Sequence, residues 1–226
     1  MKTKIIILAA TMFASLFVNA QISVGVKTGI NFADASLSGI SETLLPEAKI
    51  INTPLAGVNM QYRINEQFSF QPELNYAQRG FEAKASTAFN VLDFNIPVGI
   101  KAITKVNYIE LPVQLKYKFT TGNVQPYIMA GPSISYATSG TIREVASAII
   151  DINLGEQDIN LSNKNFNQWE AGGRLSAGVA FKTLLGEIQL EGSYYHGLTD
   201  FFTNPIVDVH AYNKGFSMQL GWAYHF

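Results

Sequence analysis

The sequence lacks cysteine entirely, and beyond residue 20 it lacks any long apolar run. Without cysteine the chain can form no disulfide, no thiolate metal site and no lipid-modified lipoprotein cysteine. A membrane helix needs about 18 consecutive apolar residues, so helical insertion is excluded as well. The formal charge is only −1, which favours neither nucleic-acid binding nor disorder. Gly-rich phosphate loops and basic stripes are also missing, so we expect no cofactor, no metal site and no nucleic-acid partner.

The first 20 residues have the pattern of a signal peptide. Lys2 and Lys4 form a positive start, residues 5–18 form an apolar core, and Val18-Asn19-Ala20 offers a small-residue cleavage site. We therefore predict cleavage after Ala20. The mature chain, residues 21–226, has a length typical of one domain.

Residues 215–226 alternate strictly between apolar and polar positions, which is the mark of a strand with two different environments. The apolar side becomes aromatic at Trp222, Tyr224 and Phe226. A membrane-spanning strand needs about ten residues with aromatics at the interface. This segment resembles the last strand of bacterial outer-membrane β-barrels, which the barrel-assembly machinery reads. We therefore expect these three aromatic residues to form an assembly signal.

The same alternation recurs in seven earlier segments, joined by long and short connections in turn. Together with residues 215–226 they predict an all-β fold, an eight-stranded antiparallel transmembrane β-barrel with long external loops and short periplasmic turns. For the segment 124–136 the pattern leaves open which side chains face the lipid and which face the interior. The connection 137–165 can be a loop or a hairpin that extends the barrel strands. The strands are expected near 22–32, 56–64, 68–76, 108–119, 124–136, 168–182 and 187–194, and the long loops at 33–52, 80–104, 137–165 and 198–213.

Alternation alone also fits a soluble barrel of the lipocalin kind. The polar face, however, mixes glycines such as Gly25 and Gly57 with isolated charges of both signs, which suits a crowded interior. The apolar face carries aromatics near the strand ends, as at bilayer interfaces. The membrane interpretation is therefore favoured. Prolines inside the expected strands must be accommodated as bulges or local gaps; these are Pro72, Pro112, Pro126 and Pro132.

Four segments stand out: GVKTGINF at 25–32, YIELPVQLKYKF at 108–119, PYIMAGPSISY at 126–136 and YYHGLTDF at 194–201. They resemble the motifs of the PorT-type outer-membrane β-barrel family, across nearly the whole mature chain. Members often carry an arginine before the tyrosine of the seventh strand, where this chain has Ser193. The resemblance implies the fold and a place in the outer membrane of a Gram-negative bacterium. It implies hardly any activity.

Charged residues recur on the face that is expected to point into the barrel. An eight-stranded barrel has an interior that side chains just fill, and buried charges persist only when they are paired. We therefore predict a structural network of charges that pair across the lumen. Glu170 and Arg174 lie four residues apart on one strand, so each should pair with another strand. The predicted network consists of Arg63, Glu73, Glu110, Lys116, Glu170, Arg174 and Glu191.

Aromatic residues in the expected external loops suggest recognition of a surface protein, a glycan or a lipid. The alternative is that they fold back onto the rim or lie at the lipid interface. The candidate recognition residues are Phe89, Phe94, Phe201 and Phe202.

The favoured function is a structural, assembly or surface-interaction role in the outer membrane, carried by the external loops. Its expected partners are outer-membrane lipid, the assembly machinery and an unknown surface ligand. A narrow channel for small solutes or ions is the alternative. A rim enzyme is a third class, but no metal-ligand spacing or nucleophile supports it, so we predict no enzyme. Its candidate residues would be His196, Asp200, Asp208 and His210.

Overall fold

The computed structural model describes residues 22–38, 47–91, 94–147, 151–161, 167–200 and 210–226. These residues form ten strands. In the part of the chain so described, no helix is long and apolar enough to cross a membrane. The strands are β1 (Ile22–Ser38), β2 (Glu47–Lys49), β3 (Ile51–Arg63), β4 (Phe68–Val91), β5 (Phe94–Lys118), β6 (Val124–Ser147), β7 (Asp151–Asp158), β8 (Trp169–Thr183), β9 (Gly186–Gly197) and β10 (His210–His225).

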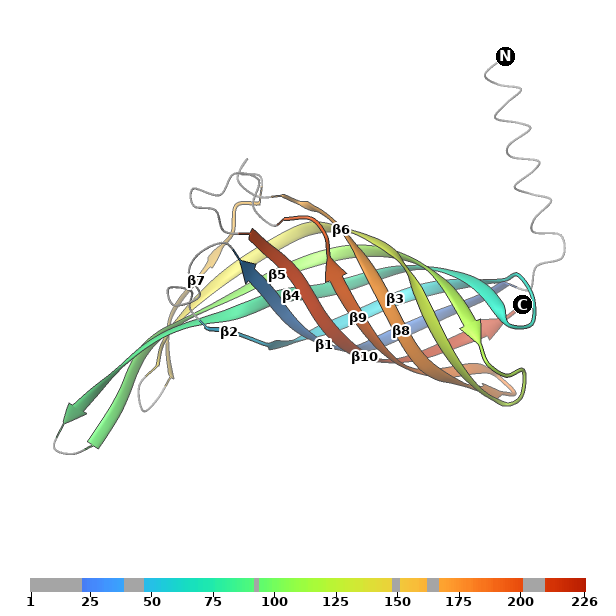
Figure 1. Ribbon diagram of the computed structural model, residues 1–226, viewed down its shortest axis with the longest axis horizontal. Helices are drawn as coiled ribbons and strands as arrows, with labels where there is room; N and C mark the ends of the chain where they lie inside the picture. Colours follow the sequence, from blue (N-terminus) through green and yellow to red (C-terminus); the bar gives the residue numbers. More distant parts are fainter. Residues whose placement is uncertain (1–21, 39–46, 92–93, 148–150, 162–166, 201–209) are drawn as a thin grey trace, which may run out of the picture.

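Eight of the strands close into an antiparallel barrel, as predicted (Figure 1). Each pairs with its neighbours in chain order, and β1 closes the ring against β10, from Ser23 opposite His225 to Ser38 opposite His210. The two other strands, β2 and β7, pair with β4 and β6 outside the ring. Closure matters because it leaves no unpaired edge within the membrane.

The alternation along each strand separates a lipid-facing side from a lumen-facing side. On β10 the outward residues are exposed, and Trp222 and Leu220 keep 42% and 57% of their surface, whereas Gln219, which precedes Leu220, keeps 2%. On β6, where the sequence left the facing open, Tyr127 and Met129 are buried in the lumen and Ile128 faces outward. The barrel therefore has an apolar outer face and a polar interior, the reverse of a soluble barrel with an apolar ligand cavity.

Three prolines interrupt three neighbouring hydrogen-bond ladders. Pairing is broken beside Pro72 between β3 and β4, beside Pro112 between β4 and β5, and beside Pro132 between β5 and β6. Pro126 is paired with Val179 without a break. A proline has no N–H to donate, so each interruption is one of the local gaps that the sequence required. The wall formed by β3 to β6 therefore has a weaker ladder than the wall formed by β8 to β10.

The prediction of a loop at 80–104 is wrong, because this segment belongs to two long strands. β4 continues to Val91 and β5 begins at Phe94, and their pairing runs without interruption through this range. In the segment 137–165, β6 continues to Ser147 and pairs with β7, which is the hairpin that the sequence left open as one alternative. Backbone pairing with the neighbouring strand overrides the weak local pattern here. Strands also enter the loop expected at 33–52, where β1 reaches Ser38 and β3 starts at Ile51.

Aromatic side chains mark two levels on the outer face. One level holds Tyr136 and Trp169, with ring centroids 4.9 Å apart, and the other holds Tyr117 between Phe68 and Phe119. On β5 the levels are separated by about eight residues at ~3.3 Å each, which at a tilt of ~40° gives a height of about 20 Å, so the two levels lie within the ~25 Å band that a membrane barrel presents to lipid.

Short turns and the described chain ends lie at one end of the barrel (Figure 1). There Phe226 donates its backbone N–H to the carbonyl of Ile22, 3.1 Å away. In the turn between β8 and β9, Gly186 has a φ of 134°, which only glycine adopts readily. We assign this end to the periplasm, because outer-membrane barrels have short periplasmic turns and long external connections. The long β4–β5 hairpin then projects outside the cell.

Candidate functional site

The lumen is the best-defined candidate site, and buried charged side chains fill it in three levels. On the extracellular side, Arg174 Nη2 donates to both oxygens of Glu110 at 2.7 Å. Arg79 lies 3.0 Å from Glu110 and 3.3 Å from Glu170. The guanidinium of Arg79 also lies over the ring of Tyr195, 3.7 Å from its centroid. All four charges of this level are therefore paired.

The middle level joins Lys27 to Glu73 at 2.5 Å and to Glu191 at 3.7 Å. Glu191 also accepts a hydrogen bond from Tyr127 at 3.1 Å. The ammonium group of Lys116 lies 4.0 Å from the centroid of the Tyr127 ring, and it donates to the side-chain oxygens of two glutamines, Gln61 and Gln71. This level again contains two cations and two carboxylates.

The periplasmic level is built around Lys118. Its Nζ donates to Glu187 and to Gln125, both at 2.7 Å. His225 approaches the same carboxylate at 3.6 Å and lies 2.5 Å from the hydroxyl of Ser23. The sequence prediction missed this group, although Lys118 and Glu187 both fall on the inward side of the alternation.

Each level balances its own charge. Among the described residues, the buried charged side chains are five cations and five carboxylates. Low-dielectric surroundings require that buried charges be compensated and hydrogen-bonded. The lumen therefore has no level with an excess charge of one sign. The ten residues are Lys27, Arg79, Lys116, Lys118, Arg174, Glu73, Glu110, Glu170, Glu187 and Glu191.

An apolar cluster covers the extracellular end of this network. Val106, Tyr108, Ala137 and Leu161 pack together there, with Ile159 against them. The backbone N–H of Ile159 donates to the carbonyl of Gly140 at 2.8 Å, which holds the segment after β7 against β6. Below it, the Tyr108 hydroxyl accepts a hydrogen bond from Asn213.

Glycines make room for the large side chains of the lumen. A Cβ on Gly172 would lie 2.5 Å from the hydroxyl of Tyr195, and a Cβ on Gly178 would lie 2.6 Å from that of Tyr127. A Cβ on Gly197 would lie 2.6 Å from the carboxylate of Glu170. The small residues on the polar face therefore create the space in which the aromatic and charged groups meet.

The structure places the predicted network residues at two sites. Glu73, Glu110, Lys116, Glu170, Arg174 and Glu191 are buried in the lumen, and both Glu170 and Arg174 contact residues of other strands. Arg63 lies apart from them, because it is half-buried at the periplasmic end, where it lines a cavity of ≈220 Å³. The periplasmic mouth is therefore a second candidate site.

The structure describes the three predicted assembly residues and the strands that contain two of the four predicted recognition residues. Phe89 belongs to β4 and Phe94 to β5, so they sit in a paired hairpin and not in a loop. Phe201 and Phe202 fall outside the described residues. On the outer face of the barrel, the three aromatic residues of the expected assembly signal are exposed, namely Trp222, Tyr224 and Phe226.

The residues proposed for a rim enzyme are only partly described. His196 is exposed, with Nδ1 3.3 Å from the Tyr194 hydroxyl. Asp200 is half-buried, Asp208 falls outside the described residues, and His210 begins β10. Within the described ranges, no group of three or more His, Cys, Asp or Glu residues could hold a metal ion.

A closed eight-stranded barrel with a lipid-facing apolar band and a polar, charge-paired interior defines an outer-membrane β-barrel protein. Residues 13–203 match the family model described as outer membrane protein beta-barrel domain. The chain belongs to this family, whose place is the outer membrane.

The chain is also similar to several solved barrels. Neisserial surface protein A is 18% identical, covering 88% of this chain and 96% of its own, with a TM-score of 0.45. OprG from Pseudomonas aeruginosa is 14% identical, covering 92% and 96%, with a TM-score of 0.46. Ail from Yersinia pestis is 12% identical, covering 90% and 99%, with a TM-score of 0.38. No curated protein matches the chain.

Proposed function

We propose that the protein is a surface-interaction protein of the outer membrane, in which a closed barrel anchors a β-sheet arm outside the cell. The observation that carries the proposal is the length of β4, β5 and β6. Beyond Tyr76, at the extracellular aromatic level, β4 continues to Val91, a distance of about 50 Å at ~3.3 Å per residue. A barrel that served only as a membrane plug would need no such extension.

The tip of the arm has two unlike faces. The register pairs Phe89 with Ile96 and Val91 with Phe94. Residues directly opposite each other in an antiparallel pair share a face, so these four apolar positions lie on one face. Asn90 pairs with Asn95 on the other. An apolar face opposite a polar one at the tip of a projecting hairpin suits a binding surface, which supports contact with a surface protein, glycan or lipid.

The test uses variants of the arm that leave the barrel intact. Replacing residues 86–99 by Asn-Gly would join Ala85 and Ile100, which are paired, through a favourable two-residue turn. The sharper comparison is the double variant Phe89→Ser with Phe94→Ser against Asn90→Ser with Asn95→Ser on the opposite face. We expect bacteria with the truncated arm or the Phe variant to lose adhesion to glycan-coated or protein-coated surfaces, while the Asn variant retains it. Equal adhesion by all variants that fold would contradict the proposal.

We further infer that the barrel does not conduct ions. The support is the packed lumen, in which three levels of paired charge lie beneath an apolar cover. Neutralising Glu110 or Arg174 should therefore create no selective current in planar bilayers, and the unaltered protein should give none. Steady single-channel conductance of the unaltered protein, lost on Arg174→Gln, would instead establish the channel alternative.

The two ends of the chain have roles in export and assembly under this proposal. Residues 1–20 would be a signal peptide removed after Ala20, and Trp222, Tyr224 and Phe226 would present the assembly signal to the barrel-assembly machinery. The motifs shared with PorT-type members support that finer assignment, and residues of different motifs meet in the lumen, Ser133 with Glu110 and Tyr127 with Lys116. The proposal assigns the protein no catalytic role.

A further inference from the structure

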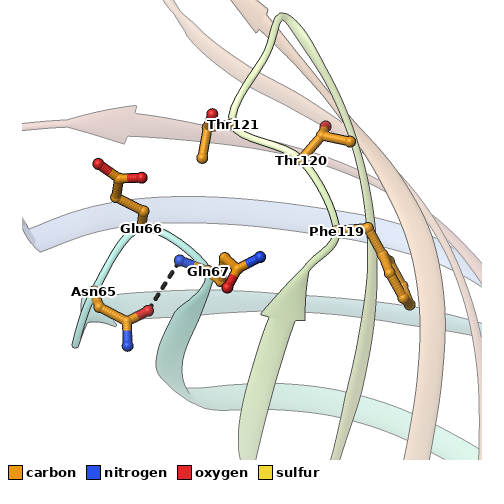
Figure 2. Close-up of a pocket in the computed structure, with 6 residues that line it drawn as sticks. All are labelled: Asn65, Glu66, Gln67, Phe119, Thr120 and Thr121. Atoms are coloured by element: carbon orange, nitrogen blue, oxygen red, sulfur yellow. Dashed lines mark hydrogen bonds between the residues drawn. The ribbon is translucent and has the colours of Figure 1, made fainter.

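The periplasmic mouth contains two adjoining hollows between short turns. One, of ≈490 Å³, lies between the turn that follows β3 and the turn that follows β5. Figure 2 shows its lining, with Asn65, Glu66 and Gln67 on one turn and Phe119, Thr120 and Thr121 on the other. The second hollow, of ≈220 Å³, shares Glu66 and Thr121 with the first and reaches toward the lumen.

Cations from three strands converge on the second hollow. Arg63 ends β3, Lys118 ends β5 and Lys182 lies near the end of β8, and all three line it. Glu66 is the one carboxylate in that lining, with Thr121 and Gln125 as polar neighbours. In the ring these strands alternate with β4 and β6, so the cations surround one side of the mouth. Glu187 balances Lys118, so Arg63 and Lys182 against Glu66 leave the mouth with one net positive charge, which favours an anion.

Contacts within the protein hold these groups in place. Lys118 is fixed by Gln125 and Glu187. Lys182 donates from Nζ to the carbonyl of Thr121 at 3.0 Å, and its backbone N–H donates to Asn123 at 2.8 Å. The amides of Gln67 and Phe68 donate to the Asn65 side chain at 2.9 and 2.7 Å, the first of which Figure 2 marks. A preorganised site loses less entropy on binding.

We propose that this mouth binds an oxyanion, a phosphate or carboxylate group, that reaches it from the periplasmic side. Arg63 and Lys182 contact the ligand, and Thr121 offers a hydroxyl donor, while the Lys118–Glu187 pair closes the lumen side of the hollow. Arginine and lysine are the side chains that bind phosphate and carboxylate best. The cavity holds several water volumes of ~30 Å³ each, which is enough for such a group together with part of the molecule that carries it.

The experiment is a titration of the folded full-length protein in detergent with inorganic phosphate, at constant ionic strength set with chloride, followed by amide NMR shifts. Saturable shifts are expected in residues 63–67, 119–123 and 182. Because a hydrogen bond to a charged group contributes more than a neutral one, Arg63→Gln and Lys182→Gln should each weaken binding by roughly tenfold. Glu66→Gln should tighten it, because it removes the carboxylate.

A matched control separates this site from general charge effects. Arg143 is an exposed cation on the extracellular arm, and Arg143→Gln should leave phosphate binding unchanged. Absence of saturable shifts, or equal weakening by Arg143→Gln, would overturn the proposal. The same titration in nanodiscs identifies the source of the oxyanion. Competition from phosphatidylglycerol but not from phosphatidylcholine indicates a lipid headgroup, and equal affinity in both indicates a soluble ligand.

Discussion

Removal of the Glu110 carboxylate is the most informative perturbation of the lumen. Glu110 is fully buried, accepts hydrogen bonds from Arg174 and Ser133, and lies 3.0 Å from Arg79. Glu110→Gln keeps the volume but leaves the two buried guanidinium groups with one carboxylate at this level, Glu170, which contacts Arg79. Breaking a buried ion pair from one side typically costs about 3–5 kcal/mol. We expect a loss of that size in the free energy of unfolding.

A double-mutant cycle tests whether the loss comes from the unpaired charge. Arg174→Met alone should also destabilise the barrel, because both carboxylate oxygens of Glu110 then lose the hydrogen bond from Arg174 Nη2. The combined variant should lose about 2 kcal/mol less than the sum of the single changes, since contacting residues couple by ~0.5–3 kcal/mol.

The assay is urea unfolding from lipid vesicles, followed by tryptophan fluorescence and by the gel-mobility shift on boiling. Trp169 and Trp222 face lipid at opposite ends of the barrel, so one signal reports both levels. Glu156→Gln, in an exposed ion pair on the arm, is the control and should not change barrel unfolding. A cost below about 1 kcal/mol for Glu110→Gln, or strict additivity in the cycle, would refute the reasoning.

Three further outcomes are expected. Gly172→Ala should destabilise the barrel by about 1–3 kcal/mol because its Cβ would meet Tyr195, whereas Gly173→Ala, with nothing within 4 Å, should be tolerated; equal unfolding free energies would contradict this. Amide exchange should be faster in the membrane part of β5, beside the proline gaps, than in β9, whose ladders are continuous; equal protection would count against a weaker wall. The hydrogen bond from Arg143 lowers the pKa of Glu156. The ion pair therefore stabilises β7 at pH values above the ordinary glutamate pKa, and this stabilisation is lost as the pH falls through the lowered pKa of Glu156. NMR shifts of β7 should follow that titration, and the pH dependence should disappear in Arg143→Gln.

The predicted charge network shows where reasoning from the sequence stops. Alternation places Glu110 and Arg174 on the inward side, but their sequence separation of 64 residues says nothing about which cation meets which carboxylate. That choice depends on the register and tilt of strands across the lumen. Arg63 follows the same inward alternation as Gln61, yet it lies at the mouth because it ends its strand.

The arm, the extension of β4, β5 and β6 beyond the membrane, shows that the local sequence pattern can also predict the wrong structure. Residues 80–104 include glycines, a proline and an irregular pattern, which predicted a loop. The structure forms strands there because β4 and β5 continue their pairing beyond the membrane, and β6 then adds to them. Whether a segment forms a strand depends strongly on the strands beside it, so the local pattern of this segment alone predicts its structure wrongly.

The sequence by itself determined the class of the protein. Period-two alternation, aromatic residues near strand ends and alternating connection lengths depend only on neighbours along the chain, and they suffice for an eight-stranded membrane barrel. Only the tertiary structure decided the facing of Tyr127, the balanced levels of the lumen, the extended arm and the convergence of Arg63, Lys118 and Lys182 at the periplasmic mouth. These features arise between residues far apart in sequence, because closure of the ring sets which strands face one another across the interior.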